Sequence, residues 1–281
     1  MGESTRRIAY LGPVGTFSEE AAALYGASQG GDFQGIPFPS FPAVAQAVET
    51  GVATEGVLPF ENSLEGAVSA TLDILIHETP LHIRGEVIVP VRHFLWGRPG
   101  SDVTAITRII SHPQALGQCR RFIDRVFPGV STVAALSTAG AVEQVMREEV
   151  MDQAAISPMR AGQHYGASLL AADIQDEKRN FTRFIALGPT DHAPTGNDKT
   201  SLVFTTQRNV PGSLQACLAE LAQSHIQLIH IESRPQRVTM GEYYFLIEFE
   251  GHREDPVIAA ALERLRARAD IVTVFGSYPA T

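Results

Sequence analysis

The feature that most constrains the fold of this chain is a change in the order of strand and helix signals near residue 190. Before it, short apolar strand patterns alternate with helical ones, as at residues 8–11 and the helix signal that follows them. Alternation of this kind predicts open α/β sheets that bind ligands at the carboxyl ends of their strands. Two such series of modest size predict two lobes with a cleft between them.

After a turn-rich, polar stretch the pattern is strand, helix, strand, strand, helix, strand, which is the ferredoxin-like order. We therefore expect an α/β chain with a two-lobed first domain, a linker and a second domain. The expected boundaries are 1–190 for the first domain, 191–198 for the linker and 199–281 for the second domain. Within the first domain we place lobe 1 at about 1–84 and 170–190, and lobe 2 at about 85–169.

Composition excludes several classes of function. The 22 Lys and Arg residues against 31 Asp and Glu residues give a formal charge of −9, which argues against a nucleic-acid partner. The only cysteines, Cys119 and Cys217, lie far apart, and the nine His residues form no recognisable metal motif, so we expect no metal site. The chain shows no signal peptide and no run long enough for a membrane helix, which predicts a cytoplasmic protein with no membrane partner.

One short strand combines a hydroxyl, an amide and a fixed cation between two aromatic rings: Asn180-Phe181-Thr182-Arg183-Phe184. A hydroxyl held near a guanidinium suits a small, anionic, oxygen-rich ligand. The structural alternative is a strand end with a β-favouring Thr and a solvated Arg. Side chains alternate along a strand, so Arg183 is expected to point away from Thr182, and one of the two then serves structure.

Three other segments carry polar groups at element ends. The loop before Thr16 exposes N–H groups at a helix start, which attract carboxylates, although Thr16 and Ser18 could act only as helix caps. Glu61-Asn62-Ser63 leaves an apolar run and could form a hydrogen-bonding floor or an ordinary polar turn. Ser111 and His112 open a helix on which Gln114 and Gln118 lie one turn apart; a capping Ser and a structural His are the alternatives there.

Together with Glu232-Ser233-Arg234-Pro235, these segments stand in the order found in prephenate dehydratases, and the chain resembles that family from about Ile8 to its end. The resemblance implies a two-lobed, type II periplasmic-binding-protein-like catalytic domain, followed by a ferredoxin-like ACT domain. It implies catalytic roles for Thr182, Glu61, Asn62, Ser111 and Gln118. It implies substrate binding by Thr16, Ser63, Arg183, Asn180 and Phe184.

The resemblance also implies a phenylalanine pocket in the ACT domain, and it assigns to that pocket Asn209, Pro211, Gly212, Ser213, Leu214, Glu232, Ser233 and Arg234. Ser213 stands where the family usually has Ala, and Leu58, Phe60 and Gly117 depart from the commoner pattern elsewhere. ACT domains usually pair, so a homodimer or homotetramer is implied, with phenylalanine as effector.

The implied substrate is prephenate, a cyclohexadiene that carries a ring carboxylate, a pyruvyl group and a hydroxyl. Loss of carbon dioxide and hydroxide makes the ring aromatic, so we expect no cofactor. We expect Thr182 to hydrogen-bond the departing hydroxyl, with Glu61 or water as the proton source. This requires Glu61, Ser111 and Thr182 to meet in one cleft.

Two alternatives remain open from the sequence. One is arogenate dehydratase, whose substrate carries an amine in place of the keto group. The other is a non-catalytic small-molecule sensor, against which the polar motifs weigh. No helical segment of suitable length precedes residue 8, so we expect no fused chorismate mutase.

Overall fold

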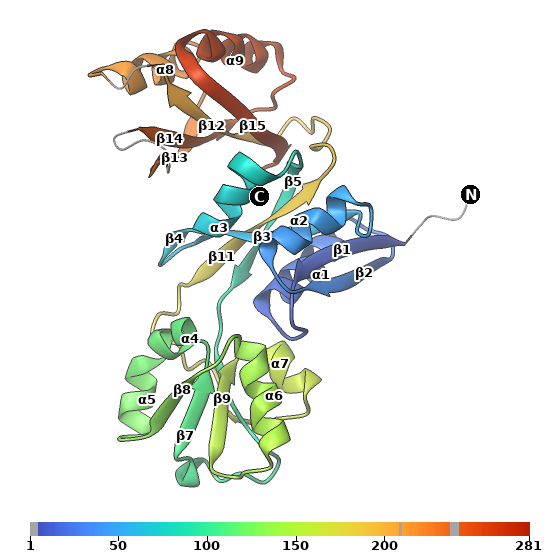
Figure 1. Ribbon diagram of the computed structural model, residues 1–281, viewed down its shortest axis with the longest axis vertical. Coiled ribbons are helices and arrows are strands. Elements are labelled where there is room, and N and C mark those ends of the chain that lie inside the picture. Colours follow the sequence, from blue (N-terminus) through green and yellow to red (C-terminus); the bar gives the residue numbers. More distant parts are fainter. Residues whose placement is uncertain (1–4, 208–209, 237–241) are drawn as a thin grey trace.

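Three β-sheets follow one another along the long axis of the computed structural model, which describes residues 5–207, 210–236 and 242–281 (Figure 1). Lobe 1 lies in the middle, lobe 2 at one end, and the third sheet with its two helices at the other. Among the described residues, no helix has both the length and the apolar character required to cross a bilayer.

Lobe 1 is built on a six-stranded sheet with the order β2-β1-β3-β11-β5, and β4 pairs with β3. Its strands are β1 (Arg6–Leu11), β2 (Phe33–Phe38), β3 (Glu55–Asn62), β4 (Gly66–Ala67), β5 (His82–Pro90) and β11 (Phe181–Gly188). Its helices are α1 (Phe17–Ser28), α2 (Phe41–Glu49), α3 (Ser69–Asp73) and a π-helical turn (Ile74–Glu78). The strand β11 lies antiparallel between β3 and β5, so it is the central returning strand of this lobe.

Lobe 2 has a five-stranded sheet with the order β10-β6-β9-β7-β8. Its strands are β6 (Phe94–Gly97), β7 (Arg108–Ser111), β8 (Ser131–Ala134), β9 (Gln153–Ser157) and β10 (Ser168–Ala171). Its helices are a 3₁₀ turn (Val103–Ala105), α4 (Pro113–Gln118), α5 (Arg120–Val126), α6 (Thr138–Glu148) and α7 (Met159–His164).

The chain passes between the lobes twice. It leaves lobe 1 after β5 and enters lobe 2 at β6, so the first passage lies at 91–93 rather than near the expected residue 85. It returns between β10 and β11. The first passage is not apparent in the sequence, because residues 86–96 form one largely apolar stretch that runs from β5 into β6.

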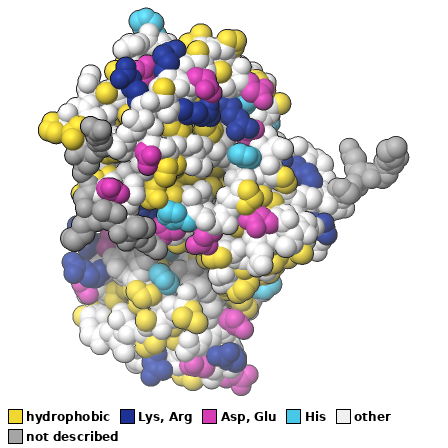
Figure 2. Space-filling view, turned by 45° about the horizontal axis from the view of Figure 1, so that its top comes forward, with side chains coloured by type: hydrophobic (Ala, Val, Ile, Leu, Met, Phe, Trp, Pro, Cys, Tyr) yellow, Lys and Arg dark blue, Asp and Glu magenta, His cyan; other side chains and the backbone are white. Residues whose placement is uncertain are grey.

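The third sheet has the ferredoxin-like order β13-β14-β12-β15. It consists of β12 (Asp198–Thr206), β13 (Leu228–Pro235), β14 (Tyr243–Glu250) and β15 (Ala269–Pro279), with helices α8 (Ser213–Ala222) and α9 (Pro256–Arg268). Basic side chains gather over the end of the molecule that carries these helices (Figure 2). Arg264 and Arg268 of α9 pair with Glu220 of α8, which offsets part of that positive charge.

Side-chain alternation along β12 gives the third sheet two buried faces. Leu202 and Phe204 pack with α8 and α9, whereas Val203 points the other way and joins the core of lobe 1. Phe275 and Tyr278 of β15 belong to that same core. The third sheet and lobe 1 therefore share one continuous apolar interface.

This interface places β15 directly against β5. A Cβ atom at Gly276 would lie 2.1 Å from the carbonyl oxygen of Ile83, and the φ angle of Gly276 is +153°. Only glycine fits such a close backbone approach at that angle.

We expect Gly276→Ala to lower the free energy of unfolding by about 1–3 kcal/mol, because the added methyl group must push two packed strands apart. Gly117→Ala is the matched control, since a Cβ there meets nothing within 4 Å; it should be neutral, or stabilising by up to about 1 kcal/mol. Denaturant unfolding of both variants measures the difference. A Gly276→Ala protein as stable as the wild type would contradict this close packing.

Candidate functional site

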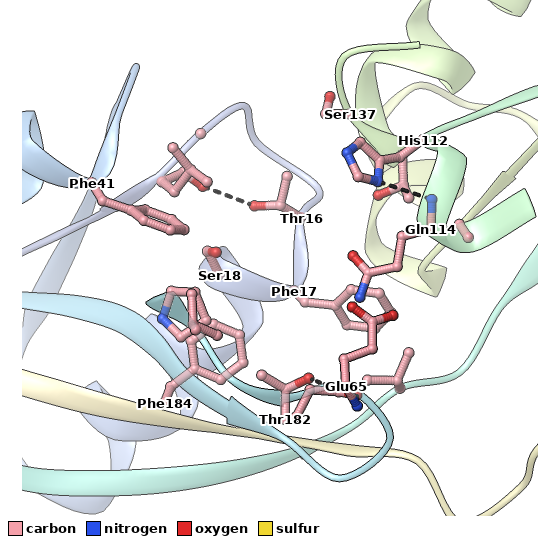
Figure 3. A pocket seen from close by; sticks show the side chains of 18 of the residues that line it. Thr16, Phe17, Ser18, Phe41, Glu65, His112, Gln114, Ser137, Thr182 and Phe184 are labelled. Carbon is pink, nitrogen blue, oxygen red and sulfur yellow. Dashed lines mark hydrogen bonds between the residues drawn. The ribbon is translucent and has the colours of Figure 1, made fainter. Parts of the chain in front are cut away.

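A cavity of about 910 Å³ opens between the two lobes. Lobe 1 contributes the start of α1, the loop between β3 and β4, and the first part of β11. Lobe 2 contributes α4 and the start of α6. Figure 3 shows Thr182 and Glu65 from lobe 1 on one side and His112, Gln114 and Ser137 from lobe 2 on the other.

The floor of the cavity is a cross-strand pair, Thr182 of β11 opposite Asn62 of β3. Asn62 Nδ2 donates to Thr182 Oγ1 (3.0 Å), to Asn180 Oδ1 (2.8 Å) and to the carbonyl oxygen of Phe181 (3.2 Å). Asn62 Oδ1 accepts from the backbone N–H groups of Leu64 (3.0 Å) and Glu65 (3.2 Å). One amide therefore fixes the Thr182 hydroxyl and shapes the loop that carries Glu65.

The neighbouring pair on the same strands, Arg183 opposite Glu61, faces away from the cavity. Arg183 binds Glu61 (2.9 Å), Glu248 of β14 (2.9 Å) and Glu86 of β5 (3.3 Å). Its guanidinium lies 4.7 Å from the centre of the Phe60 ring. The expectation that Glu61 and Arg183 face the substrate cleft is thus corrected, since strand alternation turns both toward the third sheet.

This charged cluster at the interface with the third sheet is deeply buried. Lys199 of β12 adds a contact to Glu86 (2.7 Å), and Ser201 donates to Glu248 (2.8 Å). Burial opposes the charge of Arg183, but Glu248, Tyr278 and Glu86 together outweigh burial and raise the pKa of the guanidinium. Burial would also raise the pKa of Glu248, yet Arg183 and Lys199 hold that pKa below its ordinary value. The charged forms of both groups are therefore favoured at neutral pH.

Lobe 2 presents the start of α4 to the cavity. His112 is the N-cap of α4, and its Nδ1 accepts from the N–H of Gln114 (3.3 Å). Ser111 is fully buried, and its hydroxyl donates to the carbonyl oxygen of Ile156 (2.6 Å). The expectation that Ser111 meets Thr182 in one cleft is therefore corrected. Ser111 does not line the cavity, because its hydroxyl is buried between the paired strands β7 and β9 and donates to β9.

Gln118 links the two lobes at the edge of the cavity. Its Oε1 lies 2.9 Å from Nε2 of His93, and its Nε2 donates to Glu65 Oε1 of lobe 1 (3.3 Å). His93 lines the cavity and is buried, which lowers the pKa of its imidazole despite the hydrogen bond to Gln118. The imidazole is therefore neutral at physiological pH.

The remaining predicted substrate residues divide into two groups. Thr16 and Phe184 line the cavity, and Thr16 is also the N-cap of α1, accepting from the N–H of Glu19 (3.3 Å). Asn180 and Ser63 do not line it. Asn180 accepts from Asn62, and the Ser63 hydroxyl accepts from the N–H of Phe181 (3.0 Å). Both residues therefore stabilise the Thr182–Asn62 pair without lining the cavity themselves.

Sequence reasoning assigned no role to several cavity residues: Glu65, His93, Phe17, Phe41, Ser137 and Thr138. The signal for Glu65 was its position four residues after Glu61 in the same polar segment. Ser137 follows a strand and precedes an apolar helix pattern, the same cap signature that identified Thr16. His93 had no signal, since it is a single His inside an apolar stretch.

The cavity carries little positive charge. Its titratable lining groups are Glu65, His93 and His112, and no Lys or Arg belongs to the described lining. Helices α1 and α6 both begin here, at the N-caps Thr16 and Ser137. Exposed N–H groups at such helix starts attract anions without a full cationic charge. The apolar remainder of the wall includes the rings of Phe38, Phe41 and Phe184.

A second cavity, of about 600 Å³, lies at the start of α8 in the third-sheet unit. Gly212, Ser213 and Leu214 line it, with Phe245 of β14. Pro211 is not part of its wall, and Asn209 lies outside the described residues. Glu232, Ser233 and Arg234 lie on β13, where Arg234 binds Asp73 (2.7 Å) and the carbonyl oxygen of Ser69 (2.9 Å) of lobe 1. Among the described residues of one chain, Glu232, Ser233 and Arg234 therefore do not line this second cavity.

The family model and the curated relatives that match this chain name the same enzyme family. Residues 8–192 match the model of the family described as prephenate dehydratase. A relative from Stutzerimonas stutzeri, named bifunctional chorismate mutase/prephenate dehydratase, is 40% identical over 277 residues, covering 99% of this chain and 74% of its own length. The predicted lack of a mutase segment stays a prediction.

Two solved structures share the whole architecture. A prephenate dehydratase from Arthrobacter aurescens in complex with L-Phe is 33% identical, with a TM-score of 0.87 and coverage of 98% of this chain and 90% of that one. A structure described as GqqA, a novel type of quorum quenching acylases, is 32% identical, with a TM-score of 0.86 and coverage of 98% of both chains.

Proposed function

The chain belongs to the prephenate dehydratase family, and on that premise we propose that the cavity between the lobes converts prephenate to phenylpyruvate, carbon dioxide and water in phenylalanine biosynthesis. In this reaction the bond from the ring to its carboxylate breaks, and the electron pair enters the ring. The bond from the ring to the hydroxyl breaks in turn, and the departing hydroxide takes one proton. Aromatisation drives both cleavages, so the reaction requires no redox cofactor and no metal.

The Thr182–Asn62 pair is the observation that carries this proposal. Asn62 donates to Thr182 Oγ1 at 3.0 Å, so that oxygen already has a donor and its own hydrogen is directed elsewhere. Because Thr182 lines the cavity, this hydrogen can be donated to the hydroxyl of a bound substrate. A hydrogen bond to an oxygen that gains negative charge in the transition state lowers the barrier.

Recognition of two carboxylates is assigned to neutral donors. The helix starts at Thr16 and Ser137 and the amide of Gln114 line the cavity, whereas no Lys or Arg does so in the described lining. A guanidinium on the ring carboxylate would stabilise the charge that must leave as carbon dioxide, and so would favour the ground state. Neutral donors hold the substrate without this penalty.

Glu65 is the carboxyl group that replaces Glu61 as the candidate proton source. It lines the cavity, and Asn62 fixes its backbone N–H at 3.2 Å. Glu61 instead lies against Arg183 on the opposite face of the sheet. A carboxyl group beside the departing hydroxide can deliver the proton that completes water.

Regulation is assigned to the third-sheet unit, which we interpret as an ACT domain that binds phenylalanine. Its cavity at Gly212, Ser213 and Leu214 and its ferredoxin-like topology support this, as does the L-Phe complex of the relative. A signal from this unit has a direct path, since Arg183, the neighbour of Thr182, binds Glu248 of β14. Binding of phenylalanine must favour one arrangement of this contact for activity to change.

The proposed assembly is a cytoplasmic homodimer or homotetramer. The strand β13 is an edge of the third sheet, and Ile229 and Ile231 on it are exposed. Exposed apolar side chains on an unpaired edge favour pairing with another copy. Such pairing would also supply Glu232 and Ser233 of one copy to the α8 loop of another, which resolves their separation within a single chain.

Alternative functions have less support from the site. Arogenate remains an alternative substrate, since Glu65 could bind its amine. An acylase of the nucleophile type needs a hydroxyl or thiol activated by a base. Among residues 5–207, 210–236 and 242–281, no Ser, Thr or Cys side chain hydrogen-bonds to a His ring. A non-catalytic sensor would have no use for the directed hydroxyl of Thr182.

The test of the proposed function is an assay of the purified chain with prephenate or arogenate, with and without millimolar phenylalanine. We expect prephenate to yield phenylpyruvate, detected by its absorbance, and phenylalanine to change the rate. Failure of both substrates would refute dehydratase activity. A rate independent of phenylalanine would refute the regulatory part alone.

Replacement of Thr182 tests the role of its hydroxyl. Thr182→Val keeps the shape of the side chain but removes the hydroxyl, so kcat should fall by about 10²–10⁴-fold with little change in KM. Thr182→Ser keeps the hydroxyl and should retain most of kcat. The assignment fails if the folded Val variant turns over prephenate at the rate of the Ser variant.

Two neighbouring acids form a matched pair for the proton source. Glu65→Gln should lower kcat by about 10²-fold or more, whereas Glu61→Gln should change it little, because only Glu65 lines the cavity. Both variants should be shown to be folded by circular dichroism before their initial rates are compared. A larger loss for Glu61→Gln would overturn this choice of acid.

A further inference from the structure

His93 occupies the first passage between the lobes and is held there by one side chain and one backbone N–H of the second passage. Its N–H donates to Gln175 Oε1 (2.9 Å), and its carbonyl oxygen accepts from the N–H of Ile174 (3.0 Å). The residue is 2% exposed. The edge of Phe17 packs on the imidazole with 5.7 Å between ring centres. The ring is therefore fixed at the junction of the two lobes.

Within the part of the chain that the structure describes, only one nitrogen of this ring has a hydrogen-bond partner. Nε2 lies 2.9 Å from Oε1 of Gln118, whereas Nδ1 is buried and has no partner there. Such a ring cannot exchange protons with the substrate through either nitrogen, because one is engaged by Gln118 and the other is enclosed. Its influence on the cavity must therefore pass through Gln118.

The partners of Gln118 define the tautomer of His93. Gln118 Nε2 donates to Glu65 Oε1 at 3.3 Å, and an amide oxygen can only accept. The amide oxygen of Gln118 therefore faces His93, and Nε2 of the imidazole must carry the hydrogen. Burial lowers the pKa of His93, which keeps the ring neutral in this tautomer.

We propose that His93 is a positioning residue for the dehydration reaction: its Nε2–H holds the Gln118 amide oxygen, so that the Gln118 amide nitrogen points across the cleft toward Glu65 and the substrate. This inference rests on the proposed function. Without His93 the Gln118 amide can rotate by half a turn, and its oxygen would then face the Glu65 carboxylate. The Gln118 N–H would then no longer point at Glu65, so the cavity would lose one aligned donor at this edge.

The kinetic test compares three variants with prephenate as substrate. His93→Phe keeps a ring but removes the donor, and should lower kcat by about 10–100-fold. His93→Gln places an amide N–H near the position of Nε2 and should restore most of that loss. Gln118→Leu removes the group on which His93 acts, so the double variant His93→Phe/Gln118→Leu should be no slower than Gln118→Leu alone.

Two results would overturn the proposal in folded proteins, with folding judged from thermal melting. One is an additive loss in the double variant, which would mean that His93 acts independently of Gln118. The other is a His93→Gln variant as slow as His93→Phe, which would mean that the ring matters only for packing.

A spectroscopic test needs no substrate and so separates this inference from the proposed function. Nitrogen-15 NMR of the wild-type imidazole should show the Nε2–H tautomer and a pKa below the ordinary value for His. A predominant Nδ1–H tautomer would refute the inference even in an active enzyme. The expected tautomer in an inactive protein would uphold the geometry and reject only the substrate.

Discussion

The architecture depends on two adjacent cross-strand pairs between β3 and β11 that face opposite ways. Thr182 and Asn62 point into the cavity between the lobes, while Arg183 and Glu61 point toward the third sheet. Because successive side chains of a strand alternate, neither pair can move without the other. We propose that a displacement of the third sheet that pulls on Arg183 would reach the Thr182 hydroxyl over a single residue.

The interface between lobe 1 and the third sheet contains both apolar and charged groups, and the two contribute differently to stability. Val203, Leu246 and Phe275 join the lobe 1 core, and this burial supplies the attraction. The buried charges of Arg183, Glu86 and Glu248 must each lose water, which makes such clusters poor sources of net stability. Their contribution is to fix the position of β14 relative to β11, since a shift of either strand would leave a buried charge without its partner.

The sequence predicted those parts of the fold that local patterns determine. The alternating series, the ferredoxin-like order and the cap Thr16 are set by neighbouring residues, whereas the N-cap of α4 is His112 and not the expected Ser111. The edge strand β2 was missed, because Gly35 and Pro37 weaken its pattern and only an edge position tolerates that proline. The helix expected to open at Ser111 and His112 ends at Gln118, and a separate helix begins at Arg120.

The site itself was predicted less evenly. Motif order pointed to Thr182, Asn62 and Gln118, which line the cavity, but it chose Glu61 as the carboxylate, whereas Glu65 lines the cavity. The choice between the two carboxylates depends on a partner about 120 residues away, because Arg183 forms an ion pair with Glu61 outside the cavity. Asn62 accepts from the backbone N–H of Glu65 and so shapes the loop that places Glu65 in the cavity. Ser111 presents the same difficulty. Its acceptor, the carbonyl oxygen of Ile156, lies 45 residues away in the sequence and comes close only because β9 pairs with β7 in the folded sheet.

The position of Arg183 also has a chemical consequence. A guanidinium at residue 182 would lie in the cavity and would bind the ring carboxylate tightly, yet this charge must disappear during decarboxylation. Placed one residue later, the same cation lies outside the cavity among three carboxylates. The reacting face of β11 keeps a neutral hydroxyl, and the opposite face keeps the charge. The alternation of one strand thus separates the face of β11 that lines the cavity from the face that contacts the third sheet.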